Sequence, residues 1–117
     1  MAIKNYRLTT AQLDILDPAT SQGVPAGERY AITNVLVCNT STTDSATFDM
    51  HLVPNGVALS NQRTCVVRQL TLPASETFTF DSERIVLEEG DKIVFVAEPD
   101  VGSGQTDLAA TVSYLEV

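Results

Sequence analysis

Apolar side chains recur at every second position along much of this sequence, and this period limits what the chain can fold into. Ala46, Phe48, Met50 and Leu52 alternate with mostly polar residues, and Leu108–Val117 shows the same alternation. Successive side chains of a β-strand point to opposite faces of the sheet, so each segment is typical of a strand with one buried face. Turn-forming residues separate such segments at intervals of about 8–12 residues, which is the spacing of β-sandwiches and barrels. The sequence therefore predicts an all-β fold, a sandwich or a barrel, and of these we favour a single-domain, jelly-roll-like antiparallel β-sandwich.

Two segments are apolar on both faces. Tyr30–Cys38 and Ile93–Ala97 carry apolar residues at consecutive positions. Strands of this kind are usually central in a sheet. We expect each to be central or to bury its second face against another chain.

Other segments leave alternatives. Pro54-Asn55-Gly56 is a turn signal after the strand that ends near Val53, and a hairpin into Val57–Leu59 is expected. Thr9–Leu16 fits a short helix or a short strand, with the strand favoured. We expect residues 1–20 to form an N-terminal arm or short strand and residues 21–117 to form the sandwich domain.

The composition excludes several classes of protein. At 117 residues with 44% hydrophobic residues, the chain has enough apolar residues for one folded domain. Its net charge of −8 argues against nucleic-acid binding, which requires clustered Lys and Arg. Residues 1–75 hold five acids and five bases, whereas residues 76–117 hold ten acids and two bases. The acidic character is therefore concentrated in the last third of the chain.

Candidate catalytic and metal-binding residues are few. His51 is the only histidine, and the alternation places it on the polar face of its strand, where we expect it to be exposed. The acids Glu88, Glu89 and Asp91 lack the ligand spacing of a calcium loop, so solvated turns are expected there. No nucleophile motif is present. The sequence thus predicts a protein that is not an enzyme and has no cofactor and no metal.

The cysteines and the N-terminus bear on the compartment. Cys38 and Cys65 each adjoin an apolar run, which favours two reduced, buried thiols, although a disulfide between neighbouring strands remains open. The first residues lack the apolar core of a signal peptide, and no segment is long and apolar enough to span a membrane. We expect a chain made in the cytoplasm, not secreted and without a membrane partner.

A series of short motifs resembles small bacteriophage virion proteins of the β-sandwich type. The motifs are a V-P-A-G turn with an apolar strand ending in C-N, a short strand, a V-P-N-G turn, an L-P-A-x-E-T segment and an L-x-x-G-D-x-I strand pair. They occupy Val24–Asn39, Ala46–Phe48, Val53–Gly56, Leu72–Thr77 and Leu87–Ile93. The resemblance covers roughly residues 24 to 97, and the order of the motifs carries it.

The resemblance implies a structural component of a phage particle, located in the virion and assembled in the host cytoplasm. The first hypothesis is a capsid decoration, or cement, protein that binds the major capsid protein as a homo-oligomer, with a trimer favoured. A second places the module in the tail, baseplate or fibre attachment. A third is a receptor- or carbohydrate-binding module, against which the lack of Trp counts.

Six residues are candidate partner contacts under the first hypothesis. Four lie in the polar N-terminal segment, which we expect to become ordered on docking, and two arginines flank Cys65–Val67. They are Lys4, Tyr6, Arg7, Leu8, Arg63 and Arg68. The acidic turns at residues 88–91 and 99–107 are expected to face solvent, with the N-terminal half facing the particle.

Overall fold

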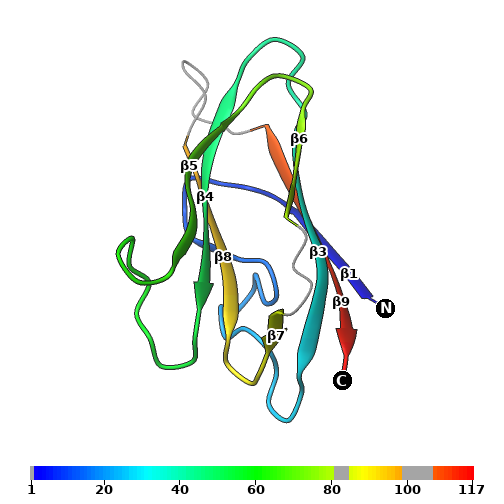
Figure 1. Cartoon of the computed structure of the whole chain (residues 1–117), viewed down its shortest axis with the longest axis vertical. Helices are drawn as coiled ribbons and strands as arrows, with labels where there is room; N and C mark the ends of the chain where they lie inside the picture. Colours follow the sequence, from blue (N-terminus) through cyan, green and yellow to red (C-terminus); the bar gives the residue numbers. More distant parts are fainter. Residues whose placement is uncertain (1, 81–84, 99–106) are drawn as a thin grey trace.

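The computed structural model of the chain is a sandwich of two antiparallel β-sheets (Figure 1). It describes residues 2–80, 85–98 and 107–117. Every regular element in these ranges is a strand. The prediction of an all-β, antiparallel β-sandwich is confirmed.

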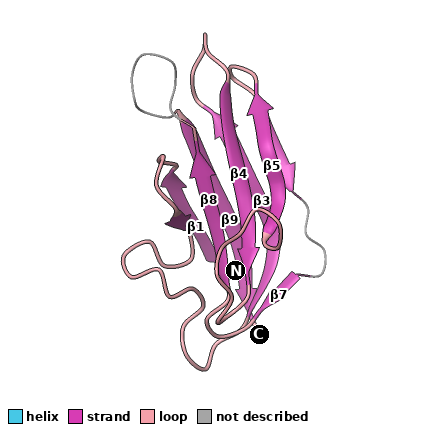
Figure 2. Ribbon diagram, turned by 90° about the vertical axis from the view of Figure 1, so that its left-hand side faces the viewer, coloured by secondary structure: helices cyan, strands magenta, loops and turns pink. Residues whose placement is uncertain are grey.

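The first sheet, which we call sheet A, joins the two ends of the chain. Its strand order is β1-β9-β3-β6, and β7 also pairs with β3. The strands are β1 (Ala2–Arg7), β9 (Leu108–Glu116), β3 (Tyr30–Asn39), β6 (Thr77–Phe80) and β7 (Ile85–Leu87). Because β1 lies antiparallel to β9, with Ala2 opposite Tyr114, the N- and C-terminal strands share one edge of the sandwich (Figure 2).

The second sheet, sheet B, has the order β2-β8-β4-β5. Its strands are β2 (Leu13–Asp14), β8 (Lys92–Ala97), β4 (Ala46–Val53) and β5 (Cys65–Leu72). The two segments that are apolar on both faces become β3 and β8, and each has strands on both sides. Their predicted central position is therefore observed.

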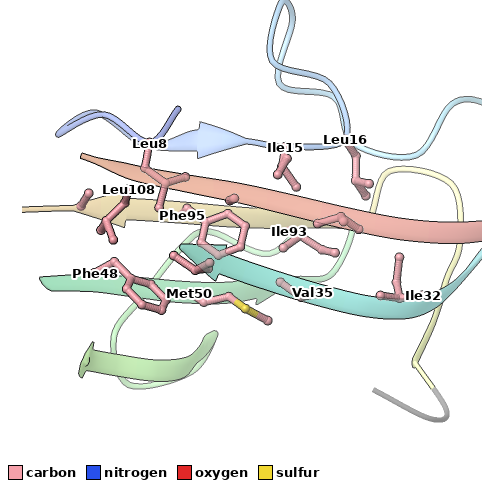
Figure 3. Close-up of a cluster of buried hydrophobic side chains, with 14 of the residues drawn as sticks. Leu8, Ile15, Leu16, Ile32, Val35, Phe48, Met50, Ile93, Phe95 and Leu108 are labelled. Atoms are coloured by element: carbon pink, nitrogen blue, oxygen red, sulfur yellow. The ribbon is translucent and has the colours of Figure 1, made fainter. Parts of the chain in front are cut away.

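Alternating apolar side chains of both sheets meet between the layers. Phe48 and Phe95 from sheet B and Val35 and Leu108 from sheet A are among the fully buried residues there (Figure 3). In β9 the residues Leu108, Ala110, Val112 and Tyr114 are all buried, as the period of two predicts. Burying apolar area of this kind is the main favourable contribution to folding.

Residues 1–20 were expected to form an arm or a short strand, and residues 2–14 contribute a strand to each sheet. All six residues of β1 pair with β9, and Leu8 after it is only 1% exposed in the core. The Lys4 ammonium donates to the Leu16 carbonyl oxygen at 2.8 Å, which links β1 to the segment after β2. These contacts hold the N-terminal segment on the body of the sandwich.

The hairpin expected at Pro54-Asn55-Gly56 is absent, because the next strand begins only at Cys65. The Asn55 amide donates to the Asp91 carboxylate at 2.9 Å, and the same carboxylate accepts the Glu88 amide at 2.9 Å. Asp91 thus joins the turn after β4 to the turn before β8. Residues 54–64 form a long loop that returns over sheet B.

Three of the motifs behind the family resemblance meet at this end of the sandwich. The Val24 amide donates to the Asp91 carbonyl oxygen at 3.0 Å, and the Gly90 amide donates to the Val24 carbonyl oxygen at 3.0 Å. Gly90 has a positive φ of 82° and lies against the Asn55 side chain. The V-P-A-G, V-P-N-G and G-D motifs are therefore turns that contact one another at one end of the sandwich.

Candidate interaction surface

The outer face of sheet A, turned away from the core, is almost free of charge. The register places residues of five strands on it. They are Ile3, Asn5 and Arg7 of β1, Ala109, Thr111, Ser113 and Leu115 of β9, Ala31, Thr33, Asn34, Leu36 and Cys38 of β3, Thr77 and Thr79 of β6, and Val86 of β7. Among the described residues of this face, Arg7 alone is charged. Its guanidinium lies 3.8 Å from the Asp107 carboxylate at the sheet edge.

Side chains on this face form aligned rows across the strands. Leu115, Ala31 and Val86 stand opposite one another on β9, β3 and β7. A second row runs through Thr111 and Leu36 near the centre of the sheet. Ile3 is 64% exposed, Val86 47% and Leu115 41%, so half of the six large exposed apolar side chains of the described chain lie here.

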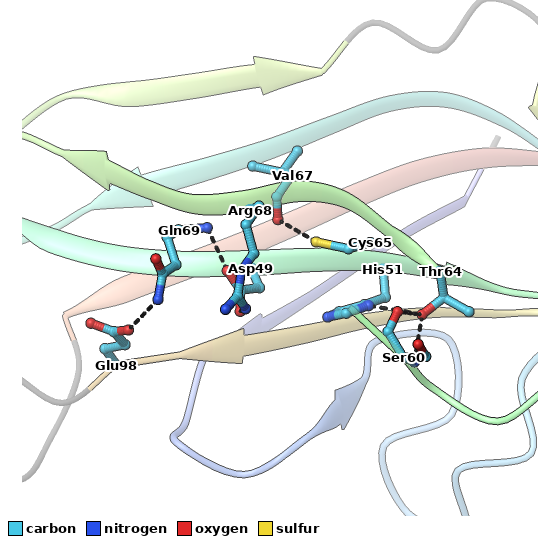
Figure 4. Close-up of polar contacts among 9 residues, drawn as sticks. All are labelled: Asp49, His51, Ser60, Thr64, Cys65, Val67, Arg68, Gln69 and Glu98. Carbon is cyan, nitrogen blue, oxygen red and sulfur yellow. Dashed lines mark hydrogen bonds and ion pairs between the residues drawn. The ribbon is translucent and has the colours of Figure 1, made fainter. Parts of the chain in front are cut away.

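The outer face of sheet B is covered by its own chain at one end. His51 and Val94 are cross-strand partners on this face and are 1% and 5% exposed. The His51 Nδ1 lies 2.9 Å from the Thr64 hydroxyl, and that hydroxyl also bonds to Ser60 (Figure 4). Val57 and Leu59 of the same loop border a small cavity together with Val94. Loop 54–64 therefore covers His51 and Val94, while Val96 further along the same face of β8 is partly exposed.

The expectation that His51 is exposed is wrong. The alternation places it correctly on the face opposite Phe48 and Met50, but loop 54–64 covers that face. Burial lowers the pKa of His51; the nearby Asp49 carboxylate acts in the opposite direction, and the Arg68 guanidinium adds to the lowering. The lowered pKa favours the neutral imidazole, which is hydrogen-bonded to Thr64.

The other end of sheet B's outer face is charged. Arg68 on β5 lies 3.0 Å from the Asp49 carboxylate of β4, which also accepts the Gln69 amide (Figure 4). Gln69 has a positive φ of 47°, beside the register shift between β4 and β5. The Gln69 side chain reaches Glu98 at 3.5 Å. This end presents both signs of charge, in contrast to sheet A.

A groove lies at the end of the sandwich where the turns meet. It encloses about 1020 Å³ between residues 16–26, 53–58 and 89–92. Lys4, Lys92, Asp17 and Glu89 give its wall both charges, and none of the described residues that line it is aromatic. Proteins usually bind sugars by stacking them on aromatic rings, and the described lining of this groove offers no ring for such a contact.

Asp14 is the one buried carboxylate beside the groove. It is 1% exposed and accepts the Leu16 amide at 3.0 Å and the Gly23 amide at 2.8 Å. Burial raises the pKa of Asp14, while the two amides and Lys92 oppose the rise. Because both carboxylate oxygens accept hydrogen bonds from backbone amides, Asp14 has a structural role, which is to hold the segment after β2 in place.

The six predicted contact residues do not form one site. Leu8 is buried in the core, so it is unavailable as a contact residue, and that expectation is wrong. Lys4 is bonded within the chain to the Leu16 carbonyl oxygen. Arg63 is exposed on loop 54–64, whereas Arg68 pairs with Asp49 on sheet B. Only Tyr6, 50% exposed, and Arg7 remain at the outer edge of sheet A.

Sequence reasoning missed the uncharged face. The sequence feature that marks this face is the lack of charge among the side chains that point away from the core. These are Ala109, Thr111, Ser113 and Leu115 in β9 and Thr77 and Thr79 in β6. Exposed sheet positions commonly carry charges that discourage association. Their omission on adjacent strands becomes visible only once the register is known.

The remaining expectations concern metals, thiols and the acidic turns. No metal-binding group of His, Cys, Asp or Glu occurs in the parts of the chain described. Cys38 and Cys65 are free and lie on different sheets. Glu88 and Glu89 are exposed, as expected, while residues 99–106 of the second acidic turn lie outside the described residues.

No protein-family model matches the chain, and no curated protein sequence matches it. Within the described ranges there is no helix with the length and apolarity needed to cross a bilayer.

Proposed function

We propose that this chain is a non-enzymatic structural protein of a phage particle, a capsid decoration protein that binds the major capsid shell as a homo-oligomer. The observation that carries the proposal is the contrast between the two outer faces. Sheet B is covered by loop 54–64 at one end and charged at the other, whereas sheet A presents a broad, uncharged face with exposed Ile3, Val86 and Leu115. Faces of this kind mark protein–protein contact.

The motif series adds support. Three of its turns are joined by hydrogen bonds around Asp91, so these motifs of the resemblance lie together at one end of the sandwich. The fold and the surface together suit a module repeated in an assembly, where many weak contacts act with avidity.

The copy number per particle tests the proposal. Particles of the phage that encodes this chain would be purified on a density gradient, and the ratio of this chain to the major capsid protein would be measured by quantitative mass spectrometry. A decoration protein is expected at hundreds of copies, and antibody labelling should cover the head. A few copies with labelling confined to the tail would replace this proposal by a tail or baseplate role, and absence from the particle would end it.

A further inference from the structure

We propose that the outer face of sheet A is the surface on which a second copy of this chain docks, face to face about a two-fold axis. Each copy would present Thr111 and Leu36 near the centre of the contact and the row Leu115, Ala31 and Val86 at one end. The inference concerns the chain alone in solution and does not depend on the particle.

The distribution of charge argues for a second copy as the occupant. In a two-fold contact every residue of the patch meets the same patch on the partner, so any excess charge is met by the same charge. The chain carries a net charge of −8, but the acids at the two ends of this face are each paired with an arginine, Glu88 with Arg29 at 3.6 Å and Asp107 with Arg7 at 3.8 Å. The outer face of sheet A is where two copies of an acidic molecule can approach without bringing acids together.

The polar groups of the face are also self-complementary. Those of Thr79, Thr111 and Ser113 are hydroxyls, each of which can donate and accept a hydrogen bond. Thr33 and Ser113 already show such a bond within the face, at 2.7 Å between their oxygens. Two identical faces can therefore satisfy one another without a complementary set of donors and acceptors.

The area of the face fits a small but specific interface. Four strand positions about 4.8 Å apart, with strands about 25–30 Å long, give a face on the order of 500–600 Å². Specific pairs bury from about 600 Å² per partner upward, so this contact lies at or just below the lower limit of that range. Packing two sheets on one another follows the same rules as the packing inside the sandwich.

β3 leads to the same conclusion. It and β8 were the two strands expected to be central or to bury their second face against another chain, and both are central. Loop 54–64 covers Val94 on that face of β8, whereas Leu36 and Cys38 on that face of β3 are partly exposed. In the proposed pair the second copy covers the outer face of β3. A two-fold contact gives a dimer, whereas the family resemblance favoured a trimer.

The first test is the mass in solution. Light scattering after size exclusion, over about 1–300 µM, covers the affinities expected of a small interface. Wild-type chain is expected to approach twice the 12.6 kDa mass of one chain as concentration rises. A single-chain mass at every concentration would overturn the inference and leave the face to a different protein.

Matched variants locate the contact. Val86→Glu changes a valine that is 47% exposed on sheet A, and Val66→Glu changes one that is 45% exposed on β5 of sheet B. Val86→Glu and Thr111→Glu should weaken the dimer at least about tenfold, whereas Val66→Glu should not change it. A dimer that persists in both sheet A variants, or that Val66→Glu alone disrupts, would contradict the assignment.

A thiol measurement on the wild-type chain avoids any doubt about variant folding. Cys38 lies on the outer face of sheet A and Cys65 on sheet B, and both are free and partly exposed. Alkylation of Cys38 should slow as the concentration rises, while that of Cys65 should not. Equal behaviour of the two thiols across the range in which the mass doubles would place the contact elsewhere.

Discussion

At the scale of single residues, His51 shows how a loop changes the chemistry of a strand position. The side chain is buried, faces Thr64 at 2.9 Å and has its pKa lowered by burial. In the unfolded chain the imidazole titrates near pH 6.5, so between that value and the lower folded pKa the unfolded state binds more protons. Folding stability therefore falls as the pH falls below about 6.5.

This gives the first prediction. The free energy of unfolding of the wild-type chain, from urea titrations, should decrease between pH 7.5 and pH 5.5 with a slope of at most about 1.4 kcal/mol per pH unit. His51→Gln should remove most of that slope, since His51 is the only histidine. An unchanged slope in the variant would show that groups other than His51 cause the dependence. Asp14 is not one of them, because a carboxyl whose pKa is raised on folding makes the fold more stable as the pH falls.

A second residue-scale prediction concerns two glycines with positive φ. A Cβ on Gly23 would lie 2.2 Å from the Asp91 carbonyl oxygen, whereas a Cβ on Gly27 would have no atom within 4 Å. Gly27→Ala should therefore incur only the left-handed backbone penalty of about 1–2 kcal/mol. Gly23→Ala should lower the free energy of unfolding by about 3 kcal/mol or more, because the backbone bonds around Asp91 must also shift. Equal losses in the two variants would refute the close approach.

At the scale of elements, alternation predicted the strands that have one buried face, such as β9. It predicted less well where another part of the chain covers the outer face. The turn at Pro54-Asn55-Gly56 is real, but the Asp91 carboxylate holds it against the turn before β8, and residues 57–64 cover His51 in place of forming a strand. Contacts between turns far apart in the sequence leave no periodic signal.

β1 was expected to become ordered only on docking, but it is paired with β9 along its whole length. The third prediction concerns how firmly it is held. Leu8 at its end is 1% exposed, while Ile3 within it is 64% exposed. Leu8→Ala should lower the free energy of unfolding by about 2–4 kcal/mol, and Ile3→Ala by less than about 0.5 kcal/mol. Urea unfolding of both variants checks this difference, and a loss of less than about 1 kcal/mol for Leu8→Ala would mean that β1 can detach.

The same contacts change what a truncation would report. Deleting residues 1–10 removes all of β1 and the buried Leu8, so it should destabilise the sandwich as well as remove Tyr6 and Arg7. Tests of an N-terminal contact therefore need surface variants such as Tyr6→Ser, not deletion.

At the scale of the whole molecule, the charge is separated by face. The sequence predicted an acidic last third, yet β9 within it contributes the uncharged centre of sheet A, because its only acid is Glu116 near its end. Among the described acids of this third, Glu88 and Glu89 lie in the segment between β7 and β8. Charge counted along the chain could predict the net value but not the face that lacks it.

This separation predicts an unusual response to salt. In a face-to-face pair the centres lie about 28 Å apart, the middle dimension of the fold, along which its two sheets stack (Figure 1). Two molecules of net charge −8 at that distance repel by several kcal/mol at 10 mM salt but by less than about 1 kcal/mol at 150 mM, where the Debye length is about 8 Å. A pair joined through uncharged faces has no interfacial ion pairs to lose. Its dissociation constant should therefore fall at least about tenfold across this range, as measured by sedimentation equilibrium.

The control is Thr111→Lys, which adds a positive charge at the centre of the face and reduces the net charge to −7. Its pairing should be weaker than that of the wild type at 150 mM salt, because each lysine meets the uncharged, desolvated patch of the partner and the lysine of the other copy. If wild-type pairing weakened as salt was added, ion pairs would be holding the two copies together, and the contact would have to lie on one of the charged faces instead.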